Sequence, residues 1–369
     1  MTATWIHTGY AQRIHFGAGG LDTLPSVLRD LSARRALLVT TEGRLASPDG
    51  EHLVDRLGRV LASTFGGVRS HVPASVAQAA VLQARRDGVD AVVSFGGGSC
   101  MDLGKAVTYF VEREAGTPGA SYTDRPALLH VAVPTTYSGA ELTPYFGITD
   151  DHTRAKSGGG GPTTAPIAVV YDPVLTLSTP ARVSAETAMN ALGHCVESVY
   201  ASRRSPEAEA IALSGAERIA RWLPTVIEEP EDIGPRTGLL EGAALAGRAL
   251  QNASMGVHHG LSQLLGGRTG MPHGLANALI LPHAIRYNAD VAPEALARIG
   301  AVLGDGGDPA EAVARMAARV GLPARISDLG VDEAELDAVA RLSQSNVSVR
   351  ANPRPVSEED ARAILAAAW

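Results

Sequence analysis

Residues 90–106 read DAVVSFGGGSCMDLGKA, and this stretch decides the fold class. The run 90–95 is short, apolar and rich in β-branched residues, as in a strand that is buried on both faces of a parallel sheet. Three glycines and a serine follow, and a helical pattern begins there. Glycine N–H groups can approach an anion closely, and the next helix presents its positive end to that anion. The stretch matches neither G-x-G-x-x-G nor the P-loop pattern, so a phosphate-binding turn and a plain tight turn are both open.

Outward from this stretch, strand-like runs alternate with helical patterns through the first half of the chain. The other strand-like runs cover 35–41, 128–133 and 165–171. The helical patterns cover 21–31, 51–63 and 75–86. Such alternation is typical of βαβ units in a parallel, doubly wound sheet.

The pattern changes near residue 180. From residue 184 onwards it is almost entirely helical, with Ala- and Leu-rich segments that Gly or Pro interrupts. A chain of 369 residues is about twice the usual length of one domain. We therefore predict an α/β domain at residues 1–178 and an all-helical domain at residues 179–369. The glycine-rich run 157–162 is expected to be a loop.

Composition excludes several classes of protein. The net charge is −7, and no cluster of Lys and Arg offers a surface for nucleic acid. The N-terminus lacks a basic start with an apolar run, and no stretch is apolar enough to span a membrane, so a cytoplasmic protein is expected. Two distant cysteines, Cys100 and Cys195, support neither a disulfide framework nor a thiolate zinc site.

Residues 255–288 hold four of the eleven histidines: His258, His259, His273 and His283. Histidine titrates nearest to neutral pH and is the commonest metal ligand, so this density suggests chemistry. The alternative for each is a structural role in which a ring N–H satisfies a nearby carbonyl.

A second candidate half-site lies in the first strong helical segment after the boundary. Asn190 and His194 are four residues apart and share one face of the helix. An aspartate at the first position would complete a metal half-site, whereas a neutral amide is a poor ligand for a divalent cation. The pair therefore favours a site without a metal.

Hydroxyl groups crowd the segment 133–141, VPTTYSGAE, which follows a strand-like run. The side chains of Thr135, Thr136 and Ser138 are suited to bind a cofactor's phosphates, ribose or carboxamide. Ser138 and Glu141 also have the S-x-x-E spacing of a helix capping box. The two interpretations are compatible.

Taken in order, these segments resemble the iron-containing alcohol dehydrogenase superfamily and, within it, the maleylacetate reductases. The likeness covers nearly the whole chain. The segments that carry it are FGAG (16–19), FGGGSCMDLGKA (95–106), PTTYSGAELTPYFGIT (134–149), VVYDPVLTLSTP (169–180), AMNALGHCVESVYA (188–201), VHHG (257–260), MPHGLANALILPHAIRYN (271–288) and NPRPVSEEDARAIL (352–365). The resemblance implies a nucleotide-binding α/β domain, an all-helical domain and a cleft between them.

The resemblance also assigns roles to single residues. Those that would bind the cofactor are Gly96, Gly97, Gly98, Ser99, Thr135, Thr136 and Ser138. Thr40 joins them because the strand in the run 35–41 is expected to end at Val39, and the segment TTEG that follows lacks the aspartate that would repel a 2′-phosphate. The expected cofactor is therefore NADH or NADPH.

Metal-dependent members of the superfamily use an Asp and a His four residues apart and two later histidines. The matching positions here are Asn190, His194, His259 and His273. Loss of the acidic ligand is the pattern that the resemblance associates with maleylacetate reductases, thought to work without metal. Two departures are Gln263 and Gly260, where these reductases usually carry His and often carry Lys.

The resemblance implies an NAD(P)H-dependent reductase that converts maleylacetate, an unsaturated oxo-dicarboxylate, to 3-oxoadipate in aromatic catabolism. The expected catalytic residues are Asn190, His194, His259 and His273, and the expected substrate is an anion. No metal is expected to be required, and no nucleic-acid or membrane partner is expected. The alternative is a metal-dependent alcohol dehydrogenase or carbonyl reductase, in which the three histidines hold the metal. A homodimer is expected from the resemblance.

Overall fold

The computed structural model describes residues 4–117, 119, 121–153, 156–304 and 307–369. Two compact units account for these residues. We call residues 8–136 and 140–179 the sheet unit, and residues 4–7, 137–139 and 180–369 the helical unit. The uninterrupted part of the helical unit begins at Pro180, beside the predicted boundary. The short segments 4–7 and 137–139 also belong to the helical unit, which was not expected.

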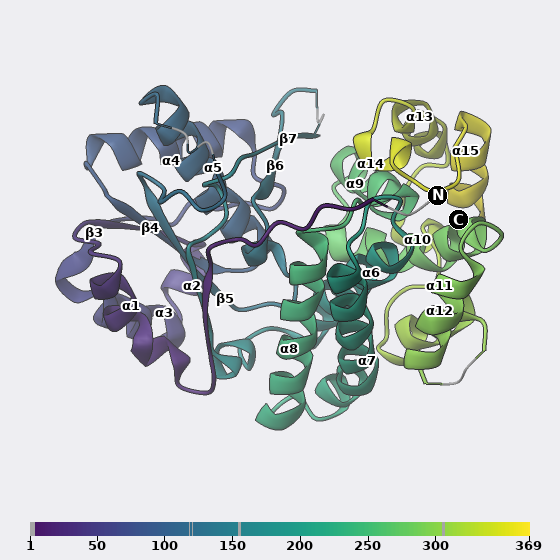
Figure 1. Ribbon diagram of the computed structural model, residues 1–369, viewed down its shortest axis with the longest axis horizontal. Coiled ribbons are helices and arrows are strands. Elements are labelled where there is room, and N and C mark those ends of the chain that lie inside the picture. Colours follow the sequence, from purple (N-terminus) through teal and green to yellow (C-terminus); the bar gives the residue numbers. More distant parts are fainter. Residues whose placement is uncertain (1–3, 118, 120, 154–155, 305–306) are drawn as a thin grey trace. The chain divides into compact units, whose positions relative to one another are not determined.

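The sheet unit is built on six strands that pair in parallel, which confirms the predicted fold class (Figure 1). Their order across the sheet is β1 (Arg13–Phe16), β8 (Ala168–Tyr171), β5 (Leu129–Pro134), β4 (Ala91–Gly96), β2 (Ala36–Val39) and β3 (Leu61–Phe65). The four inner strands are buried at every position. This is why they appear in the sequence as continuous apolar runs and not as alternating patterns.

Helices cover both faces of this sheet. Alternate strand residues such as Leu38, Val93 and Phe95 pack in one cluster with α1 (Leu24–Asp30) and α3 (Pro48–Leu57). The other face meets α5 (Gly98–Glu114), beside which α4 (Ala74–Arg86) lies (Figure 1). Full burial of one such aliphatic side chain stabilises the fold by roughly 1.5–3 kcal/mol.

Three features of the sheet unit differ from the predictions. β3 lies partly within the predicted helix 51–63, because α3 ends at Leu57 and Gly58 takes a positive φ of 49°. β6 (Tyr145–Thr149) was missed, and the predicted loop 157–162 is wrong over most of its length. There β7 (Lys156–Gly160) pairs antiparallel with β6. A Cβ on Gly159 would lie 2.5 Å from the Phe146 ring, so the close pairing of β6 and β7 requires glycine there. The same glycines made the sequence pattern resemble a loop.

The helical unit confirms the predicted helical pattern. Its α-helices are α6 (Ala181–Tyr200), α7 (Pro206–Glu228), α8 (Ile233–Leu250), α9 (Val257–Thr269), α10 (His273–Asn288), α11 (Pro293–Val302), α12 (Pro309–Arg319), α13 (Ala334–Ser343), α14 (Val347–Arg350) and α15 (Glu358–Ala367). α6 is buried on all sides and packs against α7, α8 and α10 (Figure 1). A helix of this kind can hold polar side chains only where partners are supplied.

Among the described residues, no helix is both long enough and apolar enough to cross a membrane. Cys100 and Cys195 are both free and buried.

Candidate active site

The glycine turn predicted at residues 96–99 joins β4 to α5. Gly96 has φ of 138°, a conformation that side chains other than glycine rarely adopt, and a Cβ there would lie 2.6 Å from Cys100 Sγ. A Cβ on Gly97 would approach Thr136 Cγ2 to 3.2 Å. Cys100 and Thr136 thus pack tightly against the turn. Gly98 and Ser99 begin α5, and the first N–H groups of such a helix can bind an anion.

Three threonines of the predicted cofactor set lie at the same end of the sheet. Thr40 follows β2 and donates from Oγ1 to the Phe95 carbonyl at 2.8 Å. The backbone N–H of Thr135, after β5, donates to the Gly96 carbonyl at 2.9 Å. The hydroxyls of Thr135 and Thr136 are buried and have no hydrogen-bond partner among the described residues.

These groups meet where the strand order reverses. β3 lies on one side of β2, whereas β4, β5 and β8 follow one another on its other side. In open sheets of this kind, ligands bind at the carboxyl ends of the strands where the order reverses, which here is at β2 and β4. The sheet unit therefore holds Thr40, the glycine turn and both later threonines together. Ser138 belongs to the helical unit instead. Glu141 accepts from the Tyr171 hydroxyl at 2.6 Å, so its carboxylate serves that contact.

The helical unit brings the predicted histidines together from three helices. His194 comes from α6, His259 from α9 and His273 from the first position of α10. The rings of His194 and His259 stack with centroids 4.6 Å apart, and the His273 ring centroid lies 6.4 Å from that of His259. Burial, helped by the nearby His259 and His258, holds the pKa of His194 well below its ordinary value, so His194 is neutral.

Asn190 lies one turn before His194 on the same buried helix. Its amide nitrogen donates to the Ser138 carbonyl at 3.3 Å. Its oxygen Oδ1 is buried and has no hydrogen-bond partner among the described residues. Asn190 therefore leaves a neutral acceptor, and not a carboxylate, next to the histidines.

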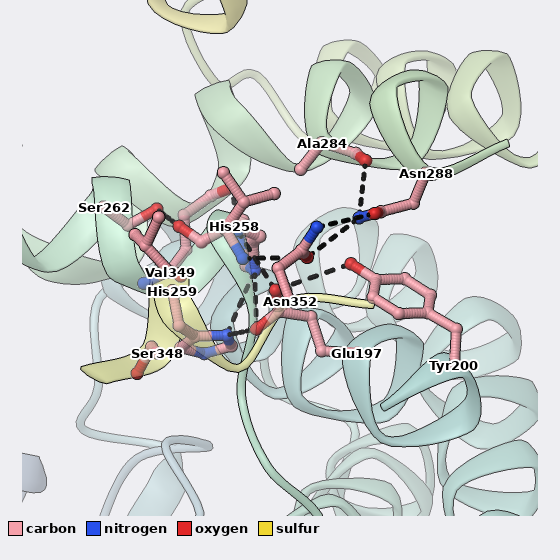
Figure 2. Close-up of polar contacts among 12 residues, drawn as sticks. Glu197, Tyr200, His258, His259, Ser262, Ala284, Asn288, Ser348, Val349 and Asn352 are labelled. Atoms are coloured by element: carbon pink, nitrogen blue, oxygen red, sulfur yellow. Dashed lines mark hydrogen bonds and ion pairs between the residues drawn. The ribbon is translucent and has the colours of Figure 1, made fainter. Parts of the chain in front are cut away.

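A residue that the sequence analysis missed lies behind the histidines. Glu197 is fully buried on α6, and its Oε2 accepts from His259 Nδ1 at 2.7 Å (Figure 2). Its Oε1 accepts from the His258 backbone N–H at 3.0 Å. The signal was present, since Glu197 stands three residues after His194 and seven after Asn190, on one helix face.

The two remaining histidines are placed differently. His258 Nε2 donates to the Asn277 carbonyl at 3.0 Å, and burial lowers the pKa of His258 to about 3. This neutral, hydrogen-bonded side chain fits the structural alternative, in which a ring N–H satisfies a nearby carbonyl. His283 lies ten residues after His273 on the same helix and is only partly buried.

The metal-dependent alternative implies an ion bound by the histidines, and the donor set fits an ion poorly. Among the described residues, one group of three has metal-type donor atoms within 4.8 Å of one another, and it is Glu197, His258 and His259. Their contacts of 2.7 and 3.1 Å are hydrogen bonds, shorter than the ~3.3 Å expected between ligands of a tetrahedral ion. The expected ligands His194, His259 and His273 form no such group, and Asn190 brings no charge.

Comparison with known proteins identifies the family of this chain. The family description "Iron-containing alcohol dehydrogenase" matches residues 11–173, and "Fe-containing alcohol dehydrogenase family, C-terminal" matches residues 184–369. The maleylacetate reductase of Rhizobium sp. strain MTP-10005 is 36% identical over 365 residues, which cover 99% of this chain and 97% of that protein.

Solved structures are equally similar. A putative alcohol dehydrogenase from Ralstonia eutropha JMP134 superposes with a TM-score of 0.89 at 36% identity, covering 100% of this chain and 98% of that one. The maleylacetate reductase from Agrobacterium tumefaciens gives a TM-score of 0.87 at 34% identity, covering 100% and 99%. The chain described here belongs to the iron-containing alcohol dehydrogenase family.

Proposed function

We propose that this oxidoreductase is a maleylacetate reductase, which uses NADH or NADPH to reduce maleylacetate to 3-oxoadipate in aromatic catabolism. The observation that carries the proposal is Asn190, whose neutral amide occupies the position of the acidic metal ligand and bonds to Ser138. Removal of that carboxylate makes the histidine cluster a better host for a dianionic substrate. The likeness to maleylacetate reductases over nearly the full chain supports the same substrate.

A bound reduced nicotinamide would supply a hydride to the alkene carbon farther from the ketone. The electrons of the C=C bond then form the C=C bond of an enolate whose negative charge lies on the ketone oxygen, and one proton is added to the alkene carbon next to the ketone. The protein must therefore stabilise an oxyanion and deliver a proton. His194, His259 and His273 are the groups that we assign to these two tasks. Asn190, one helical turn before His194, adds an acceptor without a hydrogen-bond partner among the described residues.

The buried hydroxyls of Thr135 and Thr136, together with the glycine turn, are assigned to the cofactor. Thr40 is followed by no aspartate in the segment 40–43, so both NADH and NADPH are expected to serve.

A metal-dependent alcohol dehydrogenase is the second candidate, because three histidines of the metal half-site are present. The poor fit of the donor set argues against it, and we propose that no metal is required. The protein should be purified without chelator, analysed for metal, and assayed with maleylacetate, aldehydes and ketones by NADH and NADPH absorbance. Turnover of maleylacetate that survives EDTA is expected. A stoichiometric metal that is needed for turnover would support the alcohol dehydrogenase instead.

We also propose a homodimer that works in the cytoplasm, where NADH and NADPH are available, and that has no nucleic-acid or membrane partner. Light scattering coupled to size exclusion should give twice the chain mass of 38.2 kDa. A monomer that retains full activity would contradict the dimer.

A further inference from the structure

Glu197 is surrounded by hydrogen-bond donors although it is fully buried. Its Oε1 accepts from the His258 backbone N–H at 3.0 Å and from the Tyr200 hydroxyl at 3.4 Å, and its Oε2 accepts from His259 Nδ1 at 2.7 Å (Figure 2). Burial raises the pKa of Glu197, whereas the His258 ring and backbone N–H groups nearby oppose that shift. The two donors to Oε1 compensate the ionised carboxylate for part of its lost hydration. In its ionised form Glu197 presents an acceptor, and not a donor, to His259.

His258 imposes the same condition on His259 from a second side. The Nε2 of His258 faces the Asn277 carbonyl at 3.0 Å, and a carbonyl can only accept, so Nε2 carries the proton. In the neutral His258 ring, Nδ1 then carries a lone pair and no proton. This nitrogen lies 3.1 Å from His259 Nδ1. Two acceptors thus face one nitrogen of His259.

Only one neutral tautomer of His259 satisfies both contacts. A proton on Nδ1 bonds to Glu197, whereas a bare Nδ1 would set three lone pairs against one another within 2.7 and 3.1 Å. Nε2, on the other side of the ring, then carries the lone pair. An orienting carboxylate behind a functional histidine fixes its tautomer in this way.

We propose that Glu197 is a positioning residue that holds His259 as the Nδ1–H tautomer, so that Nε2 is the nitrogen that exchanges a proton with the substrate. The proposal rests on the proposed function, because it takes the histidine cluster as the place of the reaction. The same geometry would aim Nε2 at a metal in the alternative function.

The variant Glu197→Gln tests the proposal because it reverses one contact and keeps the others. The His258 N–H and the Tyr200 hydroxyl both require an oxygen at the Oε1 position, which places the new NH₂ group opposite His259 Nδ1. That group donates, so His259 should change to the Nε2–H tautomer. Glu197→Asp keeps the carboxylate and should keep the tautomer.

The tautomer is read by ¹⁵N NMR on protein labelled at histidine, with the His259 signals assigned by comparison with His259→Gln. We expect Nδ1–H in the wild type and in Glu197→Asp, and Nε2–H in Glu197→Gln. With maleylacetate, kcat of Glu197→Gln should fall about 10²- to 10⁴-fold while KM for the cofactor stays unchanged, and Glu197→Asp should recover part of kcat.

A matched control is Glu112→Gln. Glu112 is a buried carboxylate of the sheet unit that accepts from the Ala127 backbone N–H and the Thr163 hydroxyl at 2.6 Å, and it should affect stability without affecting the His259 signals. A wild type with Nε2–H, or a loss of kcat in Glu197→Gln with an unchanged tautomer, would overturn the proposal. A wild type that shows Nδ1–H but does not reduce maleylacetate would count against the proposed function and leave the positioning role supported.

Discussion

The side-chain amide of Asn190 donates a hydrogen bond of 3.3 Å to the backbone carbonyl of Ser138. This contact fixes the direction of the amide, because only the nitrogen can donate to a carbonyl. An aspartate at this position would set a carboxylate oxygen against the carbonyl oxygen unless a proton or a cation lay between them. The contact is therefore compatible with asparagine and unfavourable for the acidic metal ligand of the family.

The variant Asn190→Asp should move the protein towards the metal-dependent members of its family. The new charge attracts a divalent cation to the histidines and repels a dianionic substrate, and like charges at close range cost several kcal/mol. We expect higher affinity for Zn²⁺ or Fe²⁺ in a chelator competition assay and a KM for maleylacetate raised about 10- to 100-fold. Asn190→Ala, which adds no charge, is the control and should gain no metal. Unchanged metal affinity in Asn190→Asp would contradict the interpretation.

Two histidines on α10 allow a paired test of the active-site assignment. His273 stands at the start of the helix near His259, whereas His283 is ten residues further along. His273→Ala should lower kcat for maleylacetate reduction about 10²- to 10⁴-fold, because a general acid or oxyanion donor is lost. His283→Ala should keep kcat within about threefold, since this partly buried side chain lies about three helical turns away from His273. Equal losses in the two variants would remove His273 from the site.

Gly260 is explained by packing. A Cβ there would lie 2.4 Å from Val349 Cγ2 and 3.0 Å from Asn346 Oδ1, which belong to α14 and its N-cap. Gly260→Ala should therefore lower the free energy of unfolding by about 1–3 kcal/mol, measured by urea denaturation. The double variant with Val349→Ala should be less destabilised than the sum of the two single variants. Additive effects would show that α9 and α14 are not in contact there. A lysine cannot occupy this position without moving α14.

His130 should make the sheet unit sensitive to acid. It is buried on β5, its Nε2 lies 2.8 Å from Ser94 Oγ, and burial lowers the pKa of His130 to about 3, with a contribution from Lys105. Below the ordinary pKa of ~6.5 the unfolded chain binds a proton that the folded chain does not. Stability is therefore present above that value and is lost as the pH falls from 6.5 towards 3.

For this one group the loss between pH 7 and pH 5 amounts to about 2 kcal/mol. His130→Gln stays neutral in both states, so its urea midpoint should change less between these two pH values than that of the wild type. His152, an exposed residue of the same unit, is the control position, and His152→Gln should leave the wild-type pH dependence unchanged. An identical slope for wild type and His130→Gln would contradict the role of His130.

The sequence predicted the parts of this protein that depend on local pattern. The inner strands β2, β4, β5 and β8 are apolar at nearly every position because both of their faces are covered, and their signal is read directly. β3 and β7 carry no such signal. β7 is mostly glycine, and it packs against the Phe146 ring of the neighbouring strand β6, a contact that hydrophobic periodicity does not reveal.

The same division holds for the candidate site. The spacing of Asn190 and His194 on one helix face, and the glycine turn after a buried strand, follow from helix and sheet periodicity and were determined by the sequence alone. Only the tertiary structure decided that Glu197 of α6 meets His259 of α9, and that Asn190 bonds to Ser138 from a distant segment. Those contacts join residues 62 and 52 positions apart. Hydrogen bonds between residues so far apart in the sequence form only when the helices pack together. Which atom donates in each bond, and with it the tautomer of His259, is therefore decided by the tertiary structure.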